Sequence, residues 1–342
     1  MTADRTRMVA IVAALAIAVV APFVLPTYIV TLLSLVFIAA LLASSIDLLA
    51  GQGGLLSIGH AGIAASAAYA IAWGTTESLA LPIQLGLALL VTLVVSAVYA
   101  LTTMRTRGIV FLMITLALGI VVYGLALKLS TITGGQNGLT GIDRPEFLAN
   151  SSAFYLLTVA AFVLAVVFRA VLARSSFGLV LRGIRESESR MSSLGYSVTR
   201  AKFLAVMLSG LLAGLAGVLI VWQAEFISPN VASFNRSAMA VVMVILGGTG
   251  TLLGPLIGAG VVVGTEHWLS SYVERWPTLL GLVFIAVVLF APGGVVGAFS
   301  RWRHGAVRDR QHAEPGTRAA LPSLLEDQGL AGGVDGRPSE PQ

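Results

Sequence analysis

Long apolar stretches separated by short polar segments occupy most of the chain between positions 8 and 291. A helix of about 20 residues crosses the roughly 30 Å hydrocarbon core of a bilayer, because each residue rises about 1.5 Å. The stretches do not alternate between apolar and polar positions, so the pattern predicts helices and not the strands of a barrel. We expect about eight spanning helices, over residues 8–25, 28–49, 60–73, 81–103, 108–129, 153–173, 203–223 and 277–291, and a broken or re-entrant helical hairpin over 237–265.

The composition agrees with a membrane protein. Of the 342 residues, 57% are hydrophobic and 11% are charged, and the mean hydropathy is +0.91. Soluble domains are about 25% charged, so this composition excludes an ordinary soluble domain. The absence of cysteine excludes disulfides and thiolate metal sites, and we expect neither a metal nor another cofactor. The predicted fold is an all-α polytopic bundle of transmembrane helices.

The basic residues predict how the chain lies in the membrane. If the N-terminus is cytoplasmic, most of the 21 Lys and Arg residues lie on the cytoplasmic side of the membrane. Those on the outer side are Lys128, Arg144, Arg236 and Arg275. This asymmetry is the one expected of the positive-inside rule. We therefore expect both termini in the cytoplasm, with residues 1–7 as a short N-terminal segment, 8–295 as the membrane domain, and 296–342 as a disordered tail rich in Arg, Gly and Pro.

One polar, basic segment, residues 174–202, lies between two long apolar stretches. Its apolar residues recur at roughly helical spacing, which predicts an amphipathic helix over 177–193. We expect this helix to end at Gly195, where a positive φ costs little. A short cytoplasmic helix that leads through a turn into a membrane helix is a lever suited to passing on the motion of a soluble partner. The alternative is a helix that lies on the lipid headgroups.

The sequence carries no motif for hydrolytic or nucleotide chemistry, since HExxH, GxSxG and GxxxxGK[ST] are all absent. If ATP drives this protein, another chain must bind it. Charged residues within the expected spans, such as Asp47 and Arg169, lie near span ends, where we expect them to reach water or headgroups. The lack of central charges argues against an ion-coupled carrier or channel, which stays as an alternative, with a non-transporting scaffold as a third possibility.

Glycines recur every four residues in the C-terminal half. Such spacing allows the backbones of two helices to approach closely in lipid, where packing joins helices. Helix packing is the prediction, and a role in gating is the lesser alternative because broken helices often line transport sites. The glycines concerned are Gly210, Gly214, Gly250, Gly254 and Gly258.

Five ordered motifs occupy much of the chain, over residues 51–70, 106–125, 133–142, 175–219 and 226–259. The longest reads SSFGLVLRGIRESESRMSSLGYSVTRAKFLAVMLSGLLAGLAGVL. In sequence and in order, these motifs together resemble the permease subunits of branched-chain amino acid ATP-binding-cassette importers, of the LivM-like type.

The resemblance implies a complex in the bacterial inner membrane. Its expected partners are a second homologous permease, two cytoplasmic ATPases and an extracytoplasmic solute-binding protein. Branched-chain amino acids are the implied substrate, and urea, amides or other amino acids are the alternatives within the same architecture. The resemblance also assigns residues 174–202 to a cytoplasmic loop that couples the permease to an ATPase, and the residues it points to there are Arg185, Glu186, Glu188, Arg190, Gly195 and Arg200.

The motif GQGGLLSIGHAG, residues 51–62, interrupts the apolar pattern between two spans. We expect unwound backbone there, which at membrane depth must be buried in protein or line a wet cavity. Gln52, Ser57 and His60 are therefore candidates for the transport pathway, and the alternative is that they pack and satisfy the backbone.

The motif TGGQNGLTGI, residues 133–142, is expected on the outer side. Its Gly-Gly and Asn-Gly steps predict turns. Gln136 and Asn137 are candidates for an outer gate or for contact with the binding protein, and an ordered turn without such a role is the alternative.

Overall fold

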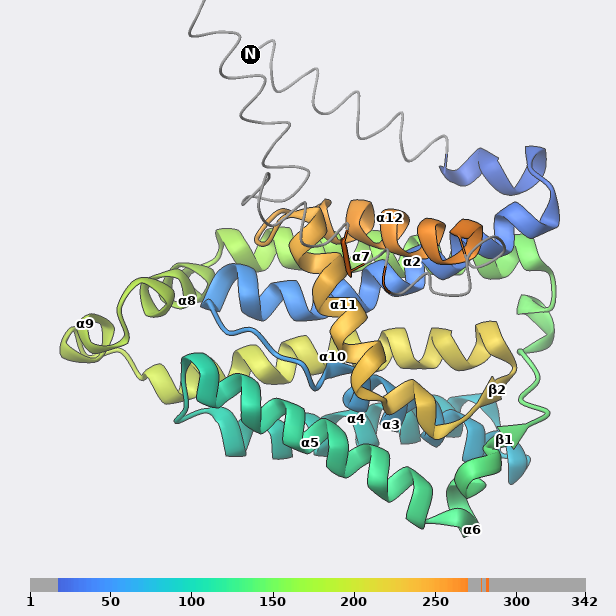
Figure 1. Cartoon of the computed structure of the whole chain (residues 1–342), viewed down its shortest axis with the longest axis horizontal. Helices are drawn as coiled ribbons and strands as arrows, with labels where there is room; N and C mark the ends of the chain where they lie inside the picture. The colour runs from blue at the N-terminus through green and yellow to red at the C-terminus, as the bar shows by residue number, and fades with distance from the viewer. Residues whose placement is uncertain (1–17, 270–277, 279–280, 283–342) are drawn as a thin grey trace, which may run out of the picture. The chain divides into compact units, whose positions relative to one another are not determined.

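The computed structural model describes residues 18–269, 278, 281 and 282, and it is mostly helical (Figure 1). The protein is a multi-pass membrane protein with no barrel in the described part. Five of the described segments are long and apolar enough to span a membrane. They are α2 (Thr27–Asp47) with the π-helix η1 (Leu48–Gly53), α4 (Leu81–Thr103), α5 (Gly108–Lys128), α7 (Ser151–Arg174) and α10 (Val198–Ala224).

The expected number of about eight spans is not confirmed. Two apolar helices are shorter, since α3 (His60–Thr76) has 17 residues and α11 (Phe234–Gly247) has 14. The expected spans over 8–25 and 277–291 lie largely outside the described residues, as do the two expected terminal segments.

Short elements connect the long helices. The fold is mostly helical, and one short pair of strands, β1 (Leu139–Thr140) and β2 (Phe226–Ile227), is antiparallel. The remaining elements are α6 (Ser130–Thr133), η2 (Gly135–Asn137), η3 (Glu146–Leu148), α8 (Ser176–Glu186), α9 (Glu188–Ser193), η4 (Pro229–Ala232) and α12 (Gly254–Leu269).

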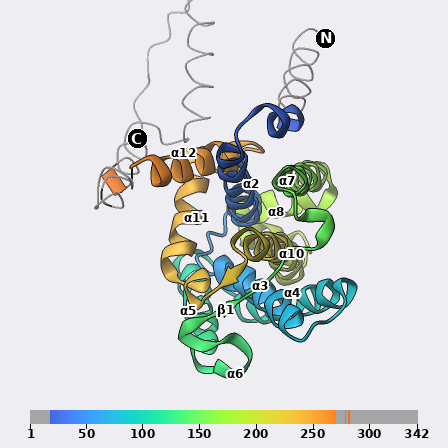
Figure 2. The same cartoon turned by 90° about the vertical axis from the view of Figure 1, so that its right-hand side faces the viewer.

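Helices α3 and α10 pack side by side in the centre of the bundle, between α2 and α4 (Figure 2). Almost every residue of α3 is buried, and most of these are alanine or glycine. Gly217 of α10 lies against the carbonyl of Ala64, so that a Cβ at this position has no room. Small residues thus let the two backbones approach, which is how helices associate where both lipid and side chains are apolar.

Helix α5 lies at the side of the bundle and buries a single face. Its buried residues are Phe111, Thr115, Gly119 and Ala126, which recur at helical spacing. The large apolar residues on its other faces, such as Met113 and Val121, are exposed. This surface suits lipid or another apolar helix, because neither offers hydrogen bonds.

Polar side chains set where several helices begin. Each accepts a hydrogen bond from a backbone N–H two or three residues ahead, as N-cap residues do. Asn150 caps α7, Ser175 caps α8, Ser187 caps α9 and Ser233 caps α11.

Helices α11 and α12 form a tight hairpin that corresponds to the expected break over 237–265. The turn between them covers residues 248–253. Gly258 lies against the carbonyl of Met243 and the amide of Gly247, which leaves no room for a Cβ between the two helices. Both helices pack along α2.

Candidate functional site

The backbone of the motif 51–62 is irregular, as its glycines predict. The α-helix α2 ends at Asp47 and continues as the π-helix η1, and Gly54 then takes a left-handed conformation with φ of 66°. The chain has no regular structure from there until α3 begins at His60. Side chains of neighbouring helices satisfy this stretch, since Thr115 Oγ1 accepts from Ile58 N at 3.3 Å and Tyr99 Oη donates to Gly59 O at 3.1 Å.

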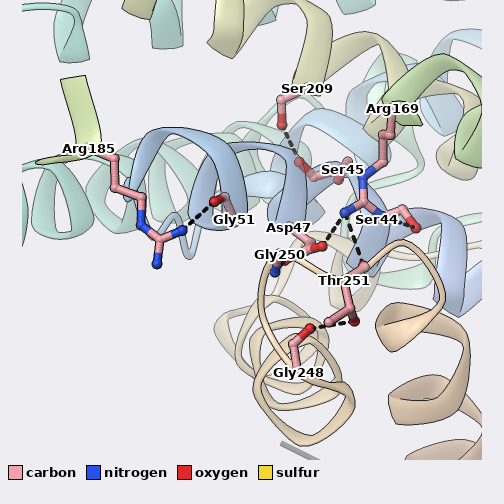
Figure 3. Close-up of polar contacts among 10 residues, drawn as sticks. All are labelled: Ser44, Ser45, Asp47, Gly51, Arg169, Arg185, Ser209, Gly248, Gly250 and Thr251. Atoms are coloured by element: carbon pink, nitrogen blue, oxygen red, sulfur yellow. Dashed lines mark hydrogen bonds and ion pairs between the residues drawn. The ribbon is translucent and has the colours of Figure 1, made fainter. Parts of the chain in front are cut away.

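Two of the three candidate pathway residues, Ser57 and His60, lie together in the protein interior. His60 Nδ1 is 2.8 Å from Ser57 Oγ, and His60 Nε2 is 2.6 Å from Ser209 Oγ. Ser209 Oγ in turn donates to Ser45 O at 2.6 Å (Figure 3).

These partners assign the proton on the imidazole. The single hydroxyl hydrogen of Ser209 goes to Ser45 O, so Ser209 must accept from His60 Nε2–H. A buried imidazole without a carboxylate partner is favoured in its neutral form, which leaves Nδ1 to accept from Ser57. The chain of hydrogen bonds is therefore complete, and it joins α2, α3 and α10 in the described structure.

The third candidate, Gln52, lies elsewhere, against the polar segment. Arg182 Nε of α8 donates to Gln52 Oε1 at 3.0 Å. From the same helix, Arg185 Nη1 donates to Gly51 O at 2.6 Å (Figure 3). The structure thus separates Gln52 from the Ser57–His60 pair and joins it to α8.

Beside η1, Asp47 of α2 forms an ion pair with Arg169 of α7. The exposed fractions of their side chains are 0% and 4%, so the expectation that both reach water or headgroups is wrong. Two opposite charges on neighbouring helices avoid the cost of an unpaired charge in the interior by pairing with each other.

The same ion pair holds the turn between α11 and α12 (Figure 3). Gly250 N donates to Asp47 Oδ1 at 2.7 Å, and Arg169 Nη2 donates to Thr251 O at 3.4 Å. Gly51 packs directly on Gly250, since a Cβ at Gly51 would lie 2.5 Å from the Cα of Gly250. Sequence reasoning missed this cluster. Its one signal was that one expected span holds a single acidic residue, Asp47, and another holds a single basic residue, Arg169.

The polar segment between α7 and α10 forms two helices, and the single helix expected over 177–193 is therefore wrong. Ser187 is extended, with φ of −163° and ψ of 106°, and its side chain accepts from Arg190 N to start α9. Gly195 follows α9 with φ of 85°, a conformation that glycine adopts without strain.

One face of the polar segment packs on the bundle and the other is open. Leu181, Ile184 and Met191 are buried. The exposed side carries both charged residues and large apolar ones, namely Arg182, Arg185, Glu186, Arg190, Leu194, Tyr196 and Arg200. A surface with both charged and large apolar side chains is compatible with contact to a soluble partner and with contact to lipid headgroups.

Glu188 is turned inward, unlike its neighbour Glu186. It pairs with Lys202 of α10, whose side chain is 1% exposed, and it lies 3.9 Å from Arg107. Lys202 Nζ also donates to Thr106 O at 2.8 Å. Glu188 therefore fixes α9 to the start of α10 and to the segment between α4 and α5.

The outer-loop candidates, Gln136 and Asn137, are exposed in η2. Arg144 holds this loop to the end of α10, donating to Trp222 O at 2.5 Å and lying 3.2 Å from Glu225. The guanidinium of Arg144 also lies 4.5 Å from the ring centroid of Phe154.

The five ladder glycines lie at close contacts between elements. Gly210 and Gly214 of α10 face Ser96 and Thr92 of α4. The other three glycines lie in the hairpin, where Gly250 faces Gly51, Gly254 faces the end of α11, and Gly258 faces Met243. Within the described residues, no group of three or more His, Asp or Glu side chains is placed to hold a metal ion.

Comparison with known proteins agrees with this architecture. The family described as "Branched-chain amino acid transport system / permease component" matches residues 28–292. The high-affinity branched-chain amino acid transport system permease protein LivM of Salmonella typhimurium is 28% identical over 318 residues, which cover 84% of this chain and 74% of that protein. The Escherichia coli LivM protein is 27% identical over the same shares.

Two further relatives match less of the chain. A probable branched-chain amino acid transport permease protein LivH of Methanocaldococcus jannaschii is 26% identical over 66% of this chain and 76% of its own length. An autoinducer 2 import system permease protein LsrC of Klebsiella pneumoniae is 30% identical over 46% of this chain and 47% of its own length. No solved structure gives a significant match.

Proposed function

Because the chain belongs to the family of permease components of branched-chain amino acid transport systems, we propose that it is a membrane permease subunit of an ATP-binding-cassette importer for these amino acids. The observation that carries the mechanism is the polar segment of α8 and α9, which lies beyond the ends of the long helices (Figure 1). It is anchored to the bundle on one face and exposes charged and apolar side chains on the other.

This segment is the proposed docking site for an ATPase. The chain has no phosphate-binding loop, so we assign ATP binding and hydrolysis to separate subunits and no catalysis to this chain. Glu186, Arg190 and Arg200 are exposed and are the side chains that we assign to the contact. Glu188 has a different role, because its ion pair with Lys202 maintains the shape of the segment.

Four partner chains complete the proposed importer: a second permease of the same family, two cytoplasmic ATPases and an extracytoplasmic binding protein. The exposed apolar residues of α4 and α5 suit either the second permease or lipid. The loop with Gln136 and Asn137 is the proposed contact for the binding protein, since Arg144 and the β1–β2 pair hold it in one conformation. In the proposed orientation, the protein lies in a bacterial inner membrane with α8 and α9 on the cytoplasmic side. Both termini are then proposed to lie in the cytoplasm.

The substrate pathway is proposed at the interface with the second permease. Within this chain, Ser57 and His60 already have buried partners, so they are assigned to support the broken backbone beside the pathway. Gln52, bonded to Arg182, is assigned to the coupling end of the pathway. Substrate then moves when ATP binding drives α8 and α9 and the bundle changes between outward-open and inward-open arrangements.

Reconstitution of the complete complex into liposomes tests this function. We expect uptake of labelled leucine that requires ATP and the binding protein and that excess unlabelled isoleucine or valine reduces. Competition by urea, amides or autoinducer 2, with none by these amino acids, would assign another substrate to the same architecture. Uptake by the purified single chain driven by an ion gradient, without an ATPase, would contradict the proposal and favour a secondary carrier.

A further inference from the structure

We propose that residues 47–52, here called the α2 relay, transmit movement of α8 to the turn between α11 and α12. The inference rests on the proposed function, because it concerns how an ATPase docked at α8 acts on the membrane domain. The relay is the short stretch that contacts α8 through one side and the α11–α12 turn through the other (Figure 3).

The first link joins α8 to the relay. Arg185 Nη1 donates to Gly51 O, and Arg182 Nε donates to Gln52 Oε1. The aliphatic part of Arg185 also covers Gly54, where an added Cβ would lie 2.8 Å from Arg185 Cγ. A charged donor on a backbone carbonyl is stronger than a neutral one, so a shift of α8 pulls directly on the backbone of the relay.

The second link joins the relay to the turn. Gly51 and Gly250 are in backbone contact, and Gly250 N donates to Asp47 Oδ1. Arg169, paired with Asp47, donates to Thr251 O in the same turn. The side chains of Asp47 and Arg169 and the contact between Gly51 and Gly250 hold the turn. A movement of the relay is therefore expected to move the turn as well.

The relay itself has the means to move. Residues 48–53 form a π-helix, whose wider hydrogen-bond register is unusual and occurs frequently at functional sites. A return to the α register shifts residues of this segment, including Gly51, relative to Asp47. The buried ion pair between Asp47 and Arg169 fits this role as well. Apolar residues can often replace such a pair without loss of stability, and in some proteins the pair serves to fix one conformation.

A probe in the turn tests the relay. This chain has no cysteine, so Leu252→Cys, at a residue that is 40% exposed, gives the chain a single site for a spin label. The chain is labelled before the complete complex is reconstituted. We expect a non-hydrolysable ATP analogue to change the spectrum of the label. Arg185→Met should remove most of this change and lower leucine uptake about tenfold, while ATP hydrolysis continues.

Two matched variants separate transmission from a general effect of charge. Arg185→Lys keeps a donor for Gly51 O and should retain most of the response. Arg174→Met removes the same charge from an exposed position at the end of α7 and should leave the response unchanged. An undiminished response in Arg185→Met, a failure of the lysine variant to restore it, or an equal loss in Arg174→Met would overturn the inference.

If Arg185→Met prevents assembly, Gly51→Ala tests the relay at its contact with the turn, since the atoms nearest to the added Cβ belong to Gly250 and Asp47 and not to α8. We expect Gly51→Ala also to remove most of the spectral change that the ATP analogue causes at the label. A change equal to that of the parent would overturn the inference. The parent complex separates the two proposals. Absence of ATP-driven uptake in the parent contradicts the proposed function, whereas normal uptake with a silent label contradicts the relay alone.

Discussion

Single polar side chains in this protein act mainly by pairing with other polar groups that are buried away from water. The carboxylate of Glu188, the imidazole of His60 and the guanidinium of Arg169 each have named partners in another helix. An unpaired polar group in such surroundings costs more than the paired group contributes. Removing one partner of such a pair is therefore expected to lower the free energy of unfolding more than replacing both partners does.

Glu188 and Lys202 allow this asymmetry to be measured. Glu188→Gln leaves the ammonium of Lys202 buried without its carboxylate, and we expect the free energy of unfolding to fall by about 1–3 kcal/mol, a range reduced for the partial exposure of Glu188. Thermal unfolding in mild detergent provides the measurement, with the exposed Glu186→Gln as control. The double variant with Lys202→Met should recover most of the loss, and failure to recover would contradict this assignment.

Ser209 links three helices through His60 and Ser45. Ser209→Ala removes the acceptor for His60 Nε2–H and the donor for Ser45 O, so the free energy of unfolding should fall by about 1–3 kcal/mol. Ser66→Ala is the matched control, because Ser66 Oγ donates within its own helix to Gly62 O. Equal stability of the two variants in denaturant unfolding would show that the hydrogen-bond chain contributes nothing.

At the scale of elements, apolar length and flanking residues made α4 and α5 predictable. The expected spans over 81–103 and 108–129 agree with α4 (Leu81–Thr103) and α5 (Gly108–Lys128). Pro82 at the start of α4 and the basic residues between the two helices mark these ends in the sequence. The irregular stretch after Gly51 was also predictable, because glycines interrupt an otherwise continuous apolar run.

Other features depend on contacts that sequence position does not reveal. A charge near the end of a span looks the same whether it reaches water or a neighbouring helix, which is why the Asp47–Arg169 pair was missed. His60 and Ser209 are 149 residues apart, with no local signal that links them. The division between α8 and α9 had a signal, since Ser187 precedes a helical segment as an N-cap, but the apolar spacing continued past it.

The α11–α12 hairpin depends on the absence of a side chain at Gly258. Gly258→Ala places a Cβ against the carbonyl of Met243 and must separate the helices, so we expect a loss of about 1–3 kcal/mol in the free energy of unfolding. Gly264→Ala in the same helix is the control, because nothing lies within 4 Å of its added Cβ. An alanine that replaces a helical glycine without meeting any neighbour is neutral or stabilising by up to about 1 kcal/mol. Similar melting temperatures for the two variants would refute close packing at Gly258.

At the scale of the whole molecule, we propose that two exposed ends of the helical bundle contact different partners. One end carries α8 and α9 with their charged, partly apolar surface, and the other carries the loop around Gln136 that Arg144 holds in place. From the family and the position of the polar segment, we propose the first end as the docking site for the ATPase. The relay between α8 and the α11–α12 turn then supplies the internal connection to the membrane helices.

Crosslinking from the polar segment tests the central claim most directly. A photoreactive group attached at Ser189→Cys, exposed on α9, is predicted to form a covalent product with an ATPase subunit in the assembled complex. The same group at Gln136→Cys, exposed in the outer loop, is predicted to give no such product. An ATPase product from position 136, or none from position 189 in a complex that transports leucine, would contradict the account.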